Sequence, residues 1–390
     1  MSILKQINTI RRAVMRRLTK NVGHSFMMAH QNRINTIQLK RVLICRPNGR
    51  LGNLLLITPL VQEIGLDFPD CKIDLFVKGK VAPIIFRNYE NIDTIIELPS
   101  KPFKQLFKYI ITWFKIRKKR YDLVVNIDQN SSSGRLSTRF ARSEFKIFGD
   151  LESGSEHYYD RQHIAKNPVY NYRHFLNIMS NSDILKPMPV LDLKLNESEI
   201  SNGKILLQQL VKNNKKTIGI FTYATGEKCY AADWWESFYA KLKLQYDDYN
   251  IIEVLPAHNA SQIAFQAPSF YSNDIREMGS LIANVNLFIA ADSGIMHLAS
   301  ASKIPVVGLF SVTDVLKYRP YNDYSLAINT NNLSIETCVE IVEKTLTKTI
   351  DTTVRPFENA KTETQKSATV KKWKFVNPYG NVWQSRPFTA

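Results

Sequence analysis

The sequence has few cysteines and no apolar run long enough to cross a membrane. The cysteines are widely spaced and form no Cys-x-x-Cys pair: Cys45, Cys71, Cys229 and Cys338. This usage indicates a reducing compartment and argues against a structural zinc site. No apolar run approaches the roughly 18–20 residues of a membrane-spanning helix. The N-terminus also lacks the apolar core and cleavage site of a signal peptide. We therefore expect a cytoplasmic protein.

Acidic residues are absent from two stretches that are rich in lysine and arginine. The chain of 390 residues has a formal net charge of +17. Residues 1–41 hold nine Lys or Arg and residues 101–120 hold eight, without one Asp or Glu. Such patches suit polyanions: nucleic acid, anionic lipid head groups or a phosphorylated glycan. No nucleic-acid-binding signature accompanies the charge, so we rank nucleic acid below the other two partners.

Short apolar runs alternate with helical stretches in two series. Runs without polar alternation indicate strands buried on both faces, as in a parallel sheet. The predicted strands are 41–45, 72–77, 92–98 and 121–128 in the first series, and 216–222, 250–256, 286–292 and 305–310 in the second. A stretch rich in Pro and polar residues, 185–199, separates the series. The expected fold is α/β, with two Rossmann-like domains facing each other across a cleft.

Four regions follow from this pattern. They are a basic N-terminal segment at 1–35, a first Rossmann-like domain at 36–186, a second at 187–345, and a C-terminal helix or tail at 346–390. With 44% hydrophobic residues, both domains can bury sizeable cores.

The stretch "LFIAADSGIMHLASASKIPVVGLFS" (287–311) carries the sharpest signal. A predicted strand ends at Asp292, Ser293 and Gly294 form a turn, and a helix begins at once. A helix N-terminus binds anions readily, and a carboxylate at a strand's carboxyl end points into the ligand crevice of an open α/β sheet. The alternative is that Asp292 or Ser293 only caps the helix.

This stretch resembles the donor-binding signature of the heptosyltransferase family, glycosyltransferase family 9, which usually reads Asp-Ser/Thr-Gly-x-x-His-Leu-Ala. The resemblance covers roughly residues 41–345. It implies the two-domain GT-B fold, with the acceptor on the first domain and the donor on the second. It also implies transfer of a sugar, typically heptose from ADP-heptose, to a lipopolysaccharide core or related glycolipid. Asp292 would then hold sugar hydroxyls, Ser293 and Gly294 the diphosphate, and His297 would contact the donor or simply pack.

A second matching segment is "IFTYATGEKCYAADWWESFYAKL" (220–242), where Lys228 falls at a Lys of the family. A cation there can neutralise a leaving diphosphate, and Thr225 can add a hydroxyl. No Asp-x-Asp motif occurs, so we expect a metal-independent, inverting enzyme without a cofactor. A solvated Lys is the alternative. For the nucleotide base, the family's loops point to His258, Asn259 and Asn273.

The loop "RPNGRLGNLLLITP" (46–59) lies on the acceptor side. The family has Gly-Asp here, and that Asp is the presumed general base; this chain has Asn53. An amide cannot accept a proton at neutral pH. Three explanations are open: Asp128 has taken over as base, Asn53 only positions the acceptor, or the protein is a catalytically impaired nucleotide-sugar or glycan binder. The spacing of Gly49 and Gly52 does not fit the dinucleotide fingerprint of an oxidoreductase.

Arginines near these loops are candidates for acceptor phosphates. They are Arg46 and Arg50 in the opening loop, and Arg135 and Arg139 in the polar stretch after Asp128.

Two stretches of the sequence are basic and amphipathic. One places Ile3, Ile7, Ile10, Val14 and Leu18 on one helical face; the other, 101–120, carries five aromatic residues among its lysines. Both suit an anionic membrane surface, although the second could also pack its aromatic face inward. We expect a peripheral protein of the inner membrane of a Gram-negative bacterium.

Overall fold

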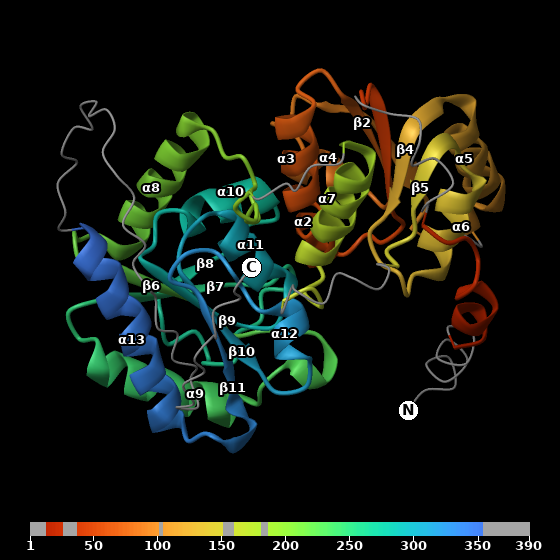
Figure 1. The fold of residues 1–390 in the computed structure, drawn as a ribbon. Coiled ribbons are helices and arrows are strands. Elements are labelled where there is room, and N and C mark those ends of the chain that lie inside the picture. Colours follow the sequence, from red (N-terminus) through yellow and green to blue (C-terminus); the bar gives the residue numbers. More distant parts are fainter. Residues whose placement is uncertain (1–12, 26–36, 101–103, 151–159, 181–185, 354–390) are drawn as a thin grey trace, which may run out of the picture. The chain divides into compact units, whose positions relative to one another are not determined.

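The computed structural model describes residues 13–25, 37–100, 104–150, 160–180 and 186–353 (Figure 1). Residues 1–351 form one compact unit, which contains two parallel sheets, and residues 352–390 form a second unit. The predicted boundary at 345 falls inside helix α13 (Ile335–Thr353). The rest of the predicted tail lies outside the described residues.

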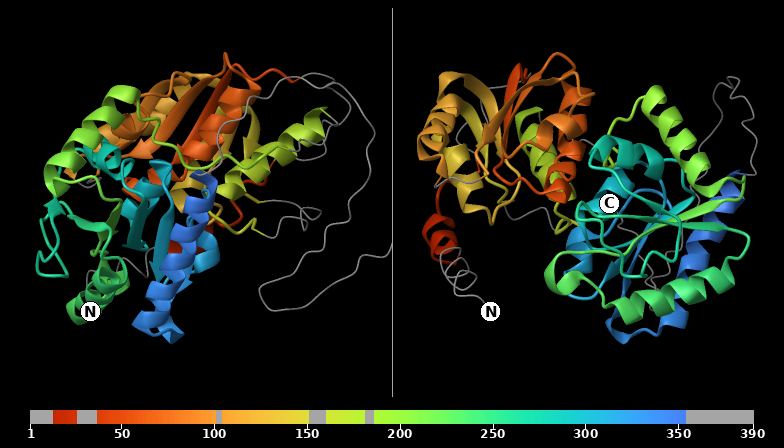
Figure 2. Two further views of the ribbon diagram at one scale, coloured as in Figure 1. Left: turned by 90° about the vertical axis from the view of Figure 1, so that its left-hand side faces the viewer. Right: turned by 180° about the vertical axis from the view of Figure 1, so that it is seen from behind.

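The first sheet has the strand order β3-β2-β1-β4-β5, with all strands parallel. Its strands are β1 (Arg41–Arg46), β2 (Lys72–Lys78), β3 (Ile92–Leu98), β4 (Arg120–Asn126) and β5 (Arg142–Ile147). Its helices are α2 (Leu51–Leu55), α3 (Thr58–Asp67), α4 (Ala82–Ile85), α5 (Leu106–Lys118), α6 (Ser132–Phe140) and α7 (Lys166–Ser180). Helices cover both faces of the sheet (Figure 2). The central strand β1 is therefore buried from Val42 to Arg46.

The second sheet has the order β11-β10-β9-β6-β7-β8, again parallel throughout. Its strands are β6 (Thr217–Phe221), β7 (Asn250–Val254), β8 (Ser269–Phe270), β9 (Leu287–Ala291), β10 (Val306–Phe310) and β11 (Leu326–Asn329). Its helices are α8 (Glu197–Val211), α9 (Ala232–Gln245), α10 (Ile275–Ile282), α11 (Gly294–Ala301), α12 (Val315–Tyr318) and α13, with 3-10 turns η2 (Gly226–Lys228) and η3 (Thr330–Asn332). The predicted α/β fold with two parallel sheets is confirmed.

The segment that joins the two sheets is held by a buried arginine. Arg276, on α10, is 2% exposed and forms an ion pair with Glu199 of α8. Its guanidinium also donates to the carbonyls of Leu193 and Lys194 in the connecting segment, and to that of Ile84 at α4. One side chain therefore ties both halves of this unit to their connection.

The N-terminal basic stretch is described only in part. Residues 13–19 are helical, with Val14 50% and Leu18 69% exposed. Ile3, Ile7 and Ile10 lie outside the described residues.

Candidate active site

A pocket of about 690 Å³ lies where the carboxyl ends of strands from both sheets meet. One wall is formed by the loop after β1 together with α2, and the other by the loops after β6, β7, β8, β9 and β10. Open parallel sheets bind ligands at this end. The walls include these residues predicted from sequence: Arg50, Asn53, Thr225, Lys228, His258, Asn273, Asp292, Ser293, Gly294 and His297.

Asp292 and Lys228 form an ion pair inside this pocket. Asp292 follows β9 and its side chain is 5% exposed, whereas that of Lys228, at the end of η2, is 34% exposed. The Lys228 Nζ lies 2.8 Å from Asp292 Oδ2, and the Thr313 hydroxyl donates to the same oxygen over 2.6 Å. Two donors therefore hold the carboxylate, and the ammonium group stays partly open to the pocket. A fixed cation of this kind can stabilise charge that develops on a leaving group.

Ser293 caps α11. Its backbone is extended and its hydroxyl accepts from the Met296 N–H. The sequence left open whether this segment caps the helix or binds an anion, and Ser293 does cap it. Capping does not exclude ligand binding, because the other N–H groups of the first turn are not paired within a helix. The Ser293 and Gly294 backbone lines the pocket at this helix end, so the anion-binding reading stays a prediction.

Glycines bring α11 and α2 into close contact. A Cβ on Gly52 would lie 2.8 Å from Cδ2 of His297 and 3.3 Å from Cα of Gly294, too near for a side chain to be added without a shift. Burial lowers the pKa of His297 to about 4, although Asp292 opposes this, so the imidazole is neutral at physiological pH. The edge of His297 packs on Gly52, and this packing sets the position of the acceptor-side wall.

Aromatic and amide side chains gather on the side of the pocket formed by the loops after β6, β7 and β8. The rings of Tyr223 and His258 meet edge to face with centroids 4.3 Å apart. Asn273 accepts a hydrogen bond from Tyr271 over 2.8 Å and also lines the pocket. Asn259, predicted as a base contact, instead sits in the turn with φ 53° and is not among the lining residues.

Arg46 joins the two candidates for the acceptor-side chemistry. It is the last residue of β1, and its buried guanidinium donates to Asn53 Oδ1 and to Asp128 Oδ2, each over 2.8 Å. Burial raises the pKa of Asp128, but the charge and hydrogen bond of Arg46 and the Asn130 N–H lower it on balance. Asp128 is therefore an ionised carboxylate at neutral pH. It is not among the residues that line the pocket.

The other predicted acceptor arginines lie in different surroundings. Arg50 is exposed at the pocket wall. Arg135 is buried, donates to the backbone carbonyls of Val22 and Gly23, and stacks its guanidinium over the Phe148 ring. The prediction that it contacts acceptor finds no support, because packing already engages its guanidinium. Arg139 is exposed at the end of α6, outside the pocket.

Sequence reasoning missed Thr313 and Tyr223. Thr313 follows β10, the strand that pairs with β9. Because parallel strands end at one edge, a polar residue after β10 is placed beside one after β9. That rule could have found Thr313. Tyr223 follows β6, and no sequence feature distinguishes it from a core tyrosine.

The described residues form neither a metal cluster nor a membrane-spanning helix. No group of three His, Cys, Asp or Glu side chains in this part of the chain could hold a metal ion. None of the helices in the described ranges is both long and apolar enough to cross a membrane.

Comparison with known proteins agrees with this geometry. The sequence model of "Glycosyltransferase family 9 (heptosyltransferase)" matches residues 112–348. A relative, lipopolysaccharide heptosyltransferase 3 of Escherichia coli (strain K12), is 25% identical over 297 residues, which cover 70% of this chain and 83% of the relative.

Two solved structures share the fold. A glycosyl transferase family 9 protein from Veillonella parvula DSM 2008 superposes with a TM-score of 0.64 at 15% identity, covering 81% of this chain and all of the other. The ADP-heptose lipopolysaccharide heptosyltransferase II of E. coli superposes with a TM-score of 0.57 at 17% identity, covering 79% of this chain and 99% of the other. The resemblance found in the sequence is thus confirmed: the chain belongs to the heptosyltransferase family, glycosyltransferase family 9, and is a glycosyltransferase of the GT-B fold.

Proposed function

We propose that this protein is an inverting, metal-independent transferase that moves heptose from ADP-heptose to a lipopolysaccharide core or a related phosphorylated glycolipid. The observation that carries the proposal is the Lys228–Asp292–Thr313 cluster at the edge of a pocket that both sheets line. The relatives' names supply the sugar and the acceptor class. We place the reaction on the cytoplasmic side of the inner membrane, where such an acceptor is available.

On the donor side, the diphosphate lies against the first turn of α11, at Ser293 and Gly294, and within reach of Lys228. The helix N-terminus and the ammonium group both favour negative charge there. Asp292 holds hydroxyls of the sugar through the oxygen that Lys228 and Thr313 leave available. Tyr223 and His258 offer an aromatic surface for the nucleotide base, with Thr225 and Asn273 beside it.

On the acceptor side, Asn53 orients the attacking hydroxyl. Asp128 does not line the pocket, but its side chain is 24% exposed and shares Arg46 with Asn53, so it takes the proton through a bridging water. The acceptor oxygen bonds to the anomeric carbon as the bond from that carbon to the diphosphate breaks, with inversion. Arg46 is a positioning residue, since its guanidinium binds both Asn53 and Asp128. Arg50, at the pocket wall, can meet phosphate on the acceptor. The comparisons give no support to the alternative of a catalytically impaired binder.

Donor binding provides the first test. ADP-heptose should raise the melting temperature of the purified protein, because a ligand at 100 times its dissociation constant adds about 2.7 kcal/mol to the stability. NAD should not. Asp292→Asn keeps the volume of the side chain but removes its charge, and should weaken the ADP-heptose shift more than the shift given by ADP alone. Equal shifts for ADP and ADP-heptose in both proteins would show that Asp292 does not contact the sugar.

A further inference from the structure

The helix α5 has two apolar faces, of which the fold buries one. Tyr109, Thr112, Trp113 and Ile116 face inward. There Trp113 meets the ring of Phe76 on β2 and that of Phe140 at the end of α6, with centroids 5.5 and 6.0 Å away. These positions follow the three- and four-residue spacing of one helical face. The inward-packing alternative from the sequence is thus correct for this half of the helix.

The second apolar face points to solvent. Its residues and their exposed fractions are Leu106 57%, Phe107 79%, Ile110 46%, Ile111 43% and Phe114 57%. They recur over the same three- and four-residue spacing and form one continuous stripe along the helix. Scattered single apolar residues are ordinary on a protein surface, but a continuous stripe marks an interaction site.

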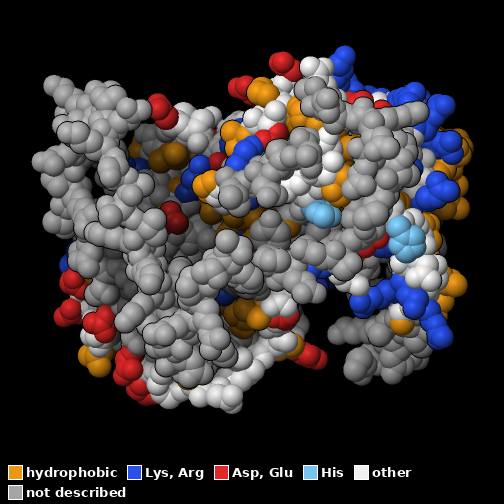
Figure 3. Space-filling view, viewed as in Figure 1, with side chains coloured by type: hydrophobic (Ala, Val, Ile, Leu, Met, Phe, Trp, Pro, Cys, Tyr) orange, Lys and Arg blue, Asp and Glu red, His pale blue; other side chains and the backbone are white. Residues whose placement is uncertain are grey.

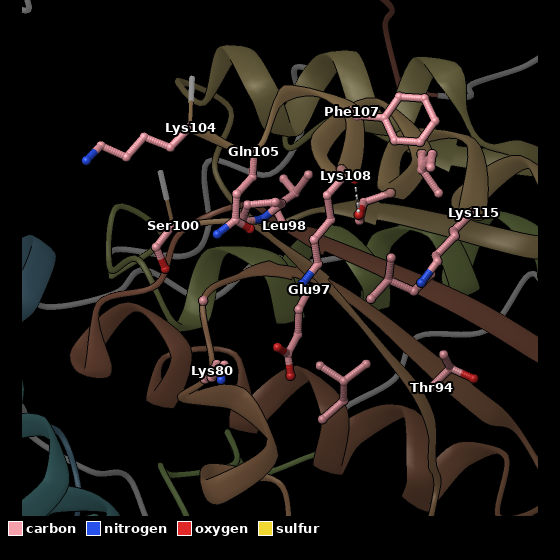
Figure 4. Close-up of a pocket in the computed structure, with 16 residues that line it drawn as sticks. Lys80, Thr94, Glu97, Leu98, Ser100, Lys104, Gln105, Phe107, Lys108 and Lys115 are labelled. Carbon is pink, nitrogen blue, oxygen red and sulfur yellow. Dashed lines mark hydrogen bonds between the residues drawn. The ribbon is translucent and has the colours of Figure 1, made fainter. Parts of the chain in front are cut away.

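Cations border this stripe on both sides. Lys104, Lys108 and Lys115 lie on the β3 side, where they line a groove of about 720 Å³ between α5 and β3 together with Lys80 (Figure 4). On the α6 side, the guanidinium of Arg117 lies 4.9 Å from the ring centroid of Phe140. Long basic side chains beside an apolar surface can cover it with their stems while their charges stay in water.

A second basic hollow continues from the C-terminal end of α5. Of the described residues, six cations and no acid line it: Arg117, Lys118, Arg120, Arg139, Arg142 and Lys146. Burial, and after it the charges of Arg139 and Arg117, lower the pKa of Lys146. Figure 3 shows Lys and Arg side chains gathered around apolar ones on the side of the molecule where Figure 1 places α5 and α6. Such a concentration of positive charge favours a partner that presents many negative charges together.

We propose that α5 is an interfacial helix, whose outer stripe enters the head-group region of an anionic lipid bilayer while the flanking cations bind lipid phosphates. An apolar face with basic borders is the pattern of helices that lie in a membrane surface. The same surface would bring the acceptor side of the pocket to a lipid-anchored acceptor. The approach to a lipid-anchored acceptor rests on the proposed function, whereas the contact with lipid does not.

Flotation of the full chain with lipid vesicles tests the proposal. The protein should float with vesicles of equal parts phosphatidylcholine and phosphatidylglycerol, much less with phosphatidylcholine alone, and less as salt rises. Leu106→Gln/Phe107→Gln/Ile110→Gln and, separately, Lys108→Glu/Lys115→Glu should each reduce binding at least about tenfold. Each Lys or Arg near an anionic surface contributes about fivefold to partitioning. Glutamine is a good helix former, so α5 is preserved.

Control variants carry substitutions of the same kinds elsewhere. Leu66→Gln/Leu244→Gln alters residues that are 71% and 83% exposed on other helices, and Lys204→Glu/Lys243→Glu alters exposed lysines of the second domain. Both should float like the unaltered protein. Equal loss in controls and α5 variants, or binding that does not depend on anionic lipid, would overturn the proposal. Vesicle binding that both α5 variants retain would also overturn the proposal. The same holds if light scattering shows that this stripe holds two copies of the chain together without lipid.

Transfer to an acceptor freed of its acyl chains separates this proposal from the proposed function. The α5 variants should keep that activity while losing vesicle binding. If the unaltered protein floats but transfers no sugar, the proposed function fails and the lipid contact stands.

Discussion

Replacing Lys228 by methionine removes a positive charge that touches the buried carboxylate of Asp292. The Nζ lies 2.8 Å from Oδ2, beside the turn of α11 to which we assign the diphosphate. Methionine keeps a similar length and apolar stem. The change therefore isolates the loss of charge.

Two effects of different size follow. Loss of one preorganised group that stabilises transition-state charge costs about 100- to 1,000-fold in kcat. The effect on folding is smaller, because the Lys228 side chain is 34% exposed and Thr313 still donates to Asp292. An exposed ion pair contributes ~0–1 kcal/mol to stability, and breaking a buried pair costs ~3–5 kcal/mol. We therefore expect this variant to lose about 1–2 kcal/mol of unfolding free energy.

The assay is the rate of ADP release with saturating ADP-heptose and core acceptor, together with urea unfolding of each variant. Lys228→Arg keeps the charge and should recover much of kcat. Thr313→Val removes the other donor to Asp292 without removing the cation, and should cost stability more than turnover. A folded Lys228→Met protein whose kcat stays within about threefold of the unaltered protein would refute the role of the ammonium group.

Three further predictions follow from named contacts. Asp128→Asn should lower kcat by about 100-fold or more without loss of donor binding, since general-base catalysis contributes that much; full activity would return the base to an unassigned group. Gly52→Ala should destabilise the fold by about 1–3 kcal/mol in a urea titration, because its Cβ would lie 2.8 Å from His297; an unchanged midpoint would mean that α2 and α11 pack less closely. Burial lowers the pKa of His163 from 6.5 to about 4, so the unfolded chain takes up the proton first as the pH falls. The stability this residue contributes above about pH 6.5 should be lost towards pH 4, and His163→Gln should flatten that part of the pH dependence of the unfolding free energy.

Much of the sheet architecture could be predicted because its central strands are apolar from end to end. β1 and β10 match their predicted ranges within one residue. β5, with the sequence RSEFKI, was missed because three of its six residues are charged and leave no apolar run. The same rule of strand ends located Asp292, and it would have located Thr313 if the loop after β10 had been considered.

The contacts of individual arginines could not be predicted, because residue type does not determine which way a side chain points. Arg46 ends a buried strand and turns to Asn53 and Asp128. Arg135 lies in a helix that looks polar in sequence, yet its guanidinium is covered by residues more than a hundred positions earlier. In α5, aromatic residues occur all around the helix, so the sequence left open which of them face inward; packing on Phe76 and Phe140 selects Trp113.

Formation of the heptosylated acceptor tests the central claim most directly. Purified protein, ADP-heptose, lipopolysaccharide core acceptor and an excess of chelator should give ADP and an extended core whose new glycosidic bond has the anomeric configuration opposite to that of the donor. A protein that binds ADP-heptose in this pocket but extends no core acceptor would contradict the proposed function. A product that retains the donor configuration, or turnover that stops when the chelator is added, would contradict an inverting, metal-independent reaction.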